Sequence, residues 1–245
     1  MSREQQLAEA FVGLADTLSH DFDPIVLLDS LTRHCVDLLG VDAAGVMVAK
    51  ANGELRTMAV SDERAAMLEL FQLQMGEGPC LDAYRTGRPV AVEDLAESAD
   101  RWPRLAPIAV AAGFRSVYAL PLRVNQHIIG ALNLLGMTPE CLSPAGQDLA
   151  QALADVAAVG LVHWRSDPAR PGEILTQVQA ALAAKASVDI ARGMLAEAGD
   201  LDPSQASRLL TMYSKQHGRR LTETAQALVR RTIGPATVLS ALPQT

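Results

Sequence analysis

A short segment rich in proline and glycine interrupts the chain well beyond its midpoint. Residues 167–172 read Asp-Pro-Ala-Arg-Pro-Gly. A helix cannot run undisturbed through Pro171, because proline lacks a backbone N–H and its ring clashes with the preceding turn. The 245 residues suffice for two domains, and 49% of them are hydrophobic, which is enough to build a core in each. We therefore expect residues 167–172 to link two separately folded parts.

Charge is distributed unevenly on the two sides of this segment. Residues 1–170 contain 13 Lys and Arg against 22 Asp and Glu, whereas residues 171–245 contain 8 against 6. Between residues 208 and 231 the only acid is Glu223, and the cations are Arg208, Lys215, Arg219, Arg220, Arg230 and Arg231. An acidic front part repels nucleic acid, whereas a compact cationic module attracts phosphate. The sequence thus predicts that contact with nucleic acid is confined to the C-terminal part.

The C-terminal part has the periodicity of helices. Asp202 precedes a proline and lies three residues before Gln205, which is the pattern of a capped helix start, and Gly218 is a stop signal. Apolar stripes at helical spacing flank this helix at Val188, Ala191, Leu195 and Ala198, and at Leu221, Ala225, Leu228 and Val229. Residues 173–186 carry a heptad-like stripe: Leu175, Val178, Leu182 and Lys185. This stripe predicts either a coiled-coil-like dimer helix or a helix that packs on its own domain.

The front part, residues 1–166, alternates helices with hairpins. Apolar spacing predicts helices near residues 4–18, 24–40, 62–75, 101–112 and 143–164. Apolar runs predict strands at 44–49, 55–60, 89–92, 116–123 and 127–135, the first two joined by an Asn-Gly turn at 52–53. Residues 76–80 are so rich in glycine and proline that we expect a loop there. The pattern predicts an α+β layer fold.

The spaced residues of the C-terminal part resemble the ANTAR domain, the RNA-binding output module of bacterial transcription antitermination regulators. They are Ala181, Leu182, Lys185, residues 191–195 (Ala-Arg-Gly-Met-Leu), Ala206, Leu209, Ser214, Arg219, Arg220, Leu221 and Ala225. Arg192 stands where the family usually has lysine, and Lys185 where arginine is common. Both departures keep the charge but change the donor geometry. The resemblance implies an all-α, three-helix RNA-binding domain over residues 187–245.

The front part resembles the GAF sensory domain in the version that commonly precedes ANTAR. Residues 74–80, 86–90, 101–103 and 116–134 carry the resemblance. It implies an antiparallel sheet with flanking helices and a ligand pocket bordered by the 76–80 loop. The candidates for lining that pocket are Glu77, Cys80 and Trp102. Cys80 in such a loop could sense oxidants, although a lone cysteine is also a small buried hydrophobe. The signal stays open, either a small molecule or a redox change, and the cyclic-GMP-binding pattern is absent.

The residues expected to contact RNA lie on the helical module. They are Lys185, Arg192, Gly193, Arg208, Tyr213, Lys215, Arg219 and Arg220. The Arg219-Arg220 pair can grip phosphate. Tyr213 can stack on an unpaired base, or it can be a tyrosine at the edge of the core.

The bulk features of the sequence suit a cytoplasmic protein. The three cysteines form no CxxC pair, which argues against a zinc site or a disulfide. The N-terminus is polar, and no apolar run reaches about 20 residues, so we expect neither a signal peptide nor a membrane span.

We expect a signal-responsive homodimer that stabilises hairpins in nascent RNA and promotes antitermination without catalysis. Three alternatives stay open: a DNA-binding regulator with residues 236–242 as recognition helix, a methionine sulfoxide reductase-like enzyme on the GAF fold, and a dimerising scaffold. The candidate recognition helix offers few base-reading side chains.

Overall fold

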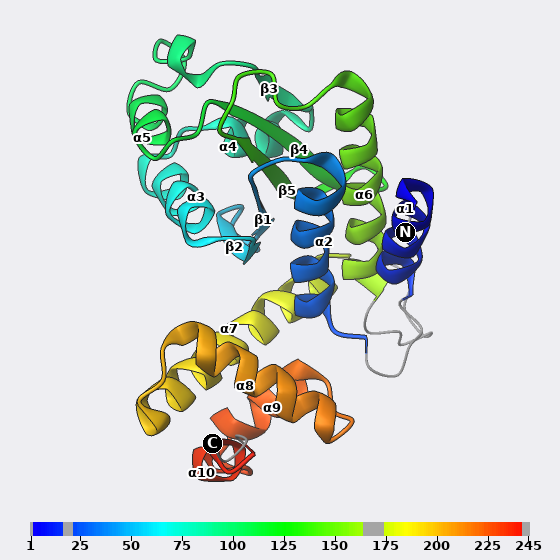
Figure 1. Ribbon diagram of the computed structural model, residues 1–245, viewed down its shortest axis with the longest axis vertical. Coiled ribbons are helices and arrows are strands. Elements are labelled where there is room, and N and C mark those ends of the chain that lie inside the picture. The colour runs from blue at the N-terminus through cyan, green and yellow to red at the C-terminus, as the bar shows by residue number, and fades with distance from the viewer. Residues whose placement is uncertain (1, 17–21, 164–173, 242–245) are drawn as a thin grey trace.

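The computed structural model describes residues 2–16, 22–163 and 174–241. Its front part is a five-stranded antiparallel sheet between two layers of helices (Figure 1). The strands, in the order β2-β1-β5-β4-β3, are β1 (Ala43–Ala49), β2 (Leu55–Val60), β3 (Val90–Val92), β4 (Ser116–Val124) and β5 (His127–Gly136). One face packs against α2 (Pro24–Leu39) and α6 (Pro144–His163), and α1 (Arg3–Ala15) packs on these two helices. The other packs against α3 (Glu63–Met75), α4 (Pro79–Thr86), η1 (Leu95–Glu97) and α5 (Leu105–Ala111). The predicted α+β fold is confirmed.

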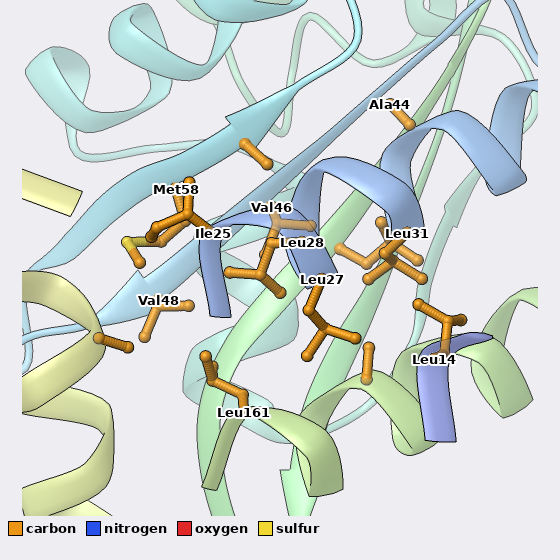
Figure 2. Close-up of a cluster of buried hydrophobic side chains, with 14 of the residues drawn as sticks. Leu14, Ile25, Leu27, Leu28, Leu31, Ala44, Val46, Val48, Met58 and Leu161 are labelled. Carbon is orange, nitrogen blue, oxygen red and sulfur yellow. The ribbon is translucent and has the colours of Figure 1, made fainter. Parts of the chain in front are cut away.

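Alternation along β1 supplies both faces of the sheet with apolar side chains, because successive strand residues point to opposite sides. Ala44, Val46 and Val48 belong to the core beneath α1, α2 and α6, where Figure 2 shows Val46 beside Leu28 of α2. Met47, between them in sequence, belongs to the core beneath α3, α4 and α5. The sheet is therefore buried on both faces, as a three-layer arrangement requires.

Local capping explains where several elements begin and end. The Asp23 carboxylate accepts a hydrogen bond from the Ile25 amide at 2.9 Å and starts α2, which ends at Gly40 in the left-handed conformation (φ 70°). The β1–β2 turn places Gly53 at φ 81°, a region that glycine enters without steric penalty. Both features lie where the sequence predicts them.

The loop expected over residues 76–80 is shorter than predicted. The turn comprises Gly76 to Gly78, and α4 begins at Pro79, so Cys80 lies in a helix rather than in a loop. Proline is favourable at the first helical position because its missing N–H would have no intrahelical partner there. A cluster of glycine and proline thus marked the start of a helix.

The C-terminal part consists of α7 (Ile174–Gly199), α8 (Pro203–Gln216), α9 (Leu221–Val229) and α10 (Pro235–Leu239). The predicted capping box is present: Asp202 accepts from the Gln205 amide at 2.7 Å, and Gln205 accepts from the Asp202 amide at 2.9 Å. Ala191, Ala206 and Ala225 are fully buried where α7, α8 and α9 meet. α7 runs unbroken through residue 186, and α10 is a short addition to the expected three helices. The expected linker at 167–172 lies outside the described residues.

The two parts share one continuous core. Val178 and Leu182 of α7 are buried in the same cluster as the side chains of α2, α6 and β1. Figure 1 shows α7 passing beneath α2 and the sheet, with α8, α9 and α10 beyond it. Val178, Leu182 and most of Lys185 of the heptad-like stripe are thus covered within their own chain, whereas Leu175 is exposed.

Candidate functional site

One face of α8 is an exposed cationic surface. Arg208 and Lys215 are exposed and lie two helical turns apart, so they share a side of the helix. The residues lining the shallow groove on this face are Ser207, Arg208, Thr211, Met212, Lys215 and Gln216. Within the described ranges neither cation forms an ion pair. This face combines free positive charge with hydroxyl, amide and thioether groups.

The turn after α8 extends the positive charge toward α9. Arg219 is exposed, and its amide donates to the Ser214 carbonyl at 2.9 Å, which closes the end of α8. Arg220 is half-buried and caps α9, with its guanidinium 3.8 Å from the Glu223 carboxylate. The two arginines therefore differ: Arg219 is open to a partner, whereas Arg220 helps to begin a helix.

Lys185 and Arg192 lie on α7, turned toward the front part of the chain. Both contact the Asp189 carboxylate, at 2.9 Å and 3.5 Å, and Arg56 of β2 contacts the same carboxylate at 3.4 Å. The Lys185 side chain keeps only 15% of its exposure. The pKa of the Asp29 carboxyl on α2 is raised because the group is buried. The positive charges of Lys185, Arg33 and Arg192, in that order, oppose this effect. Two of the expected RNA contacts thus lie beside α2 of the front part.

Tyr213 and Gly193 occupy different environments from the cations. The Tyr213 ring is buried in the helical core and stacks on His217 with 4.0 Å between ring centroids. In this arrangement it serves the core and is not presented to a base. Gly193 is exposed, and a Cβ there would meet no neighbouring atom, so packing does not require glycine at this position.

A buried aspartate joins the two parts directly. Asp23 uses Oδ1 for the Ile25 amide at 2.9 Å and Oδ2 for the Thr222 amide at 2.8 Å. One carboxylate therefore caps α2 of the front part and α9 of the C-terminal part. The Asp-Pro pattern predicted only the first of these caps, because the second partner is 199 residues away in sequence.

The three pocket candidates do not surround an open site. Cys80 and Trp102 are buried in the core beneath α3, α4 and α5. The Glu77 carboxylate caps α5 by accepting from the Arg104 and Leu105 amides at 2.7 Å and 2.9 Å. An open groove lies between the β1–β2 hairpin and the α3–α4 segment, and its lining includes Lys50, Gly53, Leu73, Tyr84 and Arg85. Among the described residues no cluster of metal-ligating side chains occurs.

Two buried polar residues beneath α3 were not singled out from the sequence. Glu69 of α3 is 1% exposed, and Asn133 of β5 is fully buried. The Asn133 amide donates to Glu69 Oε1 at 3.3 Å. The sequence does contain a feature that could have indicated them. Asn133 lies in an otherwise apolar strand, and Glu69 directly follows the apolar Leu68 in its helix.

Comparison with known families agrees with this architecture. The family model for the GAF domain matches residues 23–162, which is more than half of the chain. The chain belongs to the GAF-domain family. The family model for the ANTAR domain matches residues 176–229, so an ANTAR domain follows the GAF domain. No curated protein shows significant similarity to the chain.

Solved structures share the fold of the GAF domain. The GAF domain of an Acinetobacter phosphoenolpyruvate-protein phosphotransferase is 16% identical, with a TM-score of 0.51 over 66% of this chain and 95% of that chain. The reduced form of fRMsr of Staphylococcus aureus is 18% identical, with a TM-score of 0.52 over 65% of this chain and 95% of that one. At these identities the likeness concerns the fold alone. None of the described helices combines the length and apolar character needed to cross a membrane.

Proposed function

We propose that this GAF–ANTAR protein is a signal-responsive RNA-binding regulator that promotes transcription antitermination by stabilising hairpins in nascent RNA. The observation that carries the proposal is the exposed cationic surface of the ANTAR domain, formed by Arg208 and Lys215 on α8 and Arg219 in the following turn. Unpaired cations bind phosphates and release counterions, which supplies affinity for any structured RNA.

The proposed activity needs no catalytic group. A terminator hairpin and an overlapping antiterminator hairpin are competing folds of one transcript, and a protein that binds one of them shifts the population toward it. The groove on α8, with Met212 and hydroxyl groups beside the cations, supports contact with unpaired bases of a hairpin loop, where RNA exposes its base edges. Binding to nascent RNA would take place in the cytoplasm.

The alternatives receive less support. A DNA reader would need a helix that can enter the major groove, but α10 is five residues long and Val238 is buried in the core. A reductase on this fold would use its cysteines, but Cys35 lies in the core on one face of the sheet and Cys80 in the core on the other. A disulfide requires Cα atoms within about 7 Å, and a sheet separates these two residues.

We further propose that the GAF domain controls access to the ANTAR domain. Lys185 and Arg192 of α7 interact electrostatically with Asp29 of α2 in the GAF domain, and Thr222 at the start of α9 is capped by Asp23 of the GAF domain. A change in the GAF domain that loosened this junction would uncover the face of α7 that carries these two cations. The identity of the signal is open between a small molecule and a redox change.

The RNA-binding surface can be tested with paired charge removals in the full-length protein. The RNA is a hairpin selected from a random pool by the wild-type protein. Arg208→Ala with Lys215→Ala should weaken binding and lower the slope of log affinity against log salt by about two, one for each lost phosphate contact. Affinity measured by fluorescence anisotropy across a salt series gives both quantities.

Two further pairs serve as controls for that experiment. Arg85→Ala with Arg88→Ala removes the same charge from the exposed surface of the GAF domain and should change neither quantity. Lys185→Ala with Arg192→Ala should have a smaller effect than the α8 pair, because those cations face the junction. If the α8 pair behaved like the GAF pair, the α8 surface would not bind RNA.

A further inference from the structure

The Glu69 and Asn133 side chains face each other in the core beneath α3, on the side of the sheet away from α7. Glu69 is 1% exposed and Asn133 is fully buried. The Asn133 Nδ2 group donates to Glu69 Oε1 at 3.3 Å. A Cβ on Gly45 of β1 would collide with Oε1, so the glycine leaves the room that the carboxyl occupies. The absence of a side chain at Gly45 therefore leaves space that the Glu69 carboxyl fills.

Half of the expected hydrogen bonding is missing from the pair. Glu69 Oε2 and Asn133 Oδ1 are both buried, and neither has a hydrogen-bond partner among the residues that the structure describes. Both atoms are acceptors, so they cannot satisfy each other while Glu69 is ionised. Leaving a buried polar group unsatisfied costs about 1–3 kcal/mol, and more when the group is charged.

Protonation of Glu69 would give both unpartnered atoms, Glu69 Oε2 and Asn133 Oδ1, a hydrogen bond. A carboxylic acid and a primary amide can pair in a ring, with the amide N–H donating to one carboxyl oxygen and the acid O–H donating to the amide oxygen. The first of these bonds is present between Nδ2 and Oε1. The two unpartnered atoms, Oε2 and Oδ1, are those that the second bond would join.

We propose that Glu69 and Asn133 form a proton-binding site in the core of the GAF domain. A proton taken from solvent is held on Glu69 Oε2 and donated to Asn133 Oδ1. The site gives the sensor domain a response to pH that depends on no bound small molecule, and it is independent of the RNA-binding surface.

Within the described parts of the chain, no cation is positioned to keep Glu69 ionised. Among the described residues of the elements packed against α3 and of β5, the one titratable side chain that faces the carboxyl is the Cys80 thiol, whose pKa is raised by burial and by the Glu69 charge. β1 and α5 contain no titratable residue. The remaining titratable residues of β2, α4 and β5 are engaged elsewhere or exposed: Arg56, Asp82, Tyr84, Arg85 and His127. On α3 itself, Glu63 and Arg64 are exposed at the N-terminal end.

The proton should be lost close to neutral pH. Burial raises the pKa of Glu69 from 4.5 to about 7, although the neighbouring Thr57 and Asn133 side chains act to lower it. The folded state binds the proton more tightly than the unfolded state, so proton binding at Glu69 stabilises the folded protein. This contribution is complete below pH 4.5 and is lost as the pH rises to about 7. Within that window each pH unit lowers the folding equilibrium constant by up to about tenfold, and above it the contribution is constant.

Glu69→Gln mimics the protonated acid, because its amide N–H can donate to Asn133 Oδ1 at every pH. Urea unfolding of the full-length wild type and this variant between pH 5 and 8 should give a slope in the wild type that the variant lacks. Glu63→Gln, the same substitution at an exposed position of the same helix, should keep the wild-type slope. Equal slopes in the wild type and the Glu69→Gln variant would overturn the proposal.

Infrared spectroscopy of the wild type tests the site even if the glutamine variant fails to fold. At pH 6 the folded wild-type protein should show the carbonyl band of a protonated carboxylic acid, and at pH 8.5 that band should be gone. A spectrum without the band at pH 6 would show an ionised Glu69, and the proposal would fail.

Discussion

Asp23 uses both carboxylate oxygens as helix caps, and the two helices belong to different domains. Oδ1 accepts from Ile25 in the GAF domain and Oδ2 from Thr222 in the ANTAR domain. A cap of this kind contributes about 1 kcal/mol, with a range of about 0.5–2 kcal/mol. Since Asp23 is buried, removing either bond also leaves a polar group unsatisfied. One side chain therefore links the stability of a GAF-domain helix to that of an ANTAR-domain helix.

The three cysteines should differ in reactivity, because the thiolate is the nucleophile and burial disfavours it. Burial raises the pKa of Cys35 to about 12 and raises that of Cys80, where the Glu69 charge adds to the effect. Cys141 is half-buried, and its pKa is also raised by burial. Iodoacetamide at pH 8 should label Cys141 first in the folded protein, with Cys35 and Cys80 labelled only in urea. Rapid labelling of folded Cys80, located by mass spectrometry, would support an oxidant-sensing role instead.

At the scale of elements, α7 shows what a periodic pattern leaves undecided. Spacing identifies an apolar stripe on a helix, but it does not identify the surface that covers the stripe. In this chain Val178 and Leu182 pack against the GAF domain, while Leu175 remains exposed. A dimer through residues 173–186 would therefore compete with contacts made within the chain.

The exposed apolar residues of α1 and α6 offer an alternative dimer surface, because these helices pack together and expose Val12 (68%) and Val159 (47%). We expect light scattering to give the mass of two chains at micromolar concentration. Val12→Glu with Val159→Glu should reduce it to the mass of one, because the new charges would be desolvated in the contact. Met67→Glu with Leu70→Glu, at similarly exposed positions of α3, should leave the dimer intact. A wild-type mass of one chain would exclude the dimer.

Prediction from the sequence succeeded where the interaction is local. The starts of α2 and α8 were predicted because Asp23 and Asp202 bond to amides two and three residues away. The strands were predicted because short apolar runs bounded by turn residues have few other uses. The second partner of Asp23 and the pairing of Glu69 with Asn133 depend on how distant elements pack, which no local pattern contains. For the same reason the sequence did not separate the cations on α8 from those on α7.

For the whole molecule, the junction between the domains divides the ANTAR cations into two sets. Arg208, Lys215 and Arg219 are open to a partner, whereas Lys185 and Arg192 are held beside Asp189. The ion pair from Arg56 to Asp189 is partly exposed and contributes about 0–1 kcal/mol. Burial of α7 side chains and the Asp23 cap therefore contribute most to holding the junction closed. A modest change in either should shift the balance between closed and open arrangements.

Asp23→Asn should loosen this junction selectively. Asparagine keeps one acceptor oxygen, which can still cap α2, and places an NH2 group opposite the Thr222 amide, so the contact to α9 becomes unfavourable. Losing that buried hydrogen bond should weaken the junction by about 1–3 kcal/mol. Hydrogen exchange at the start of α9 should become faster, and affinity for the selected RNA hairpin should rise. The salt slope should steepen by up to about two as Lys185 and Arg192 reach phosphates.

Two variants make this last prediction specific. Asp62→Asn alters a cap inside the GAF domain, where the carboxylate accepts from the Ala65 amide at 2.8 Å, and should leave RNA affinity unchanged. Adding Lys185→Ala and Arg192→Ala to Asp23→Asn should return the salt slope to the wild-type value, because the gain depends on those two cations. If Asp23→Asn speeds exchange at α9 without raising RNA affinity, docking on the GAF domain does not restrain the ANTAR domain. The GAF domain would then serve RNA binding only by assembling the protein, since opening the junction would have exposed nothing that RNA can use.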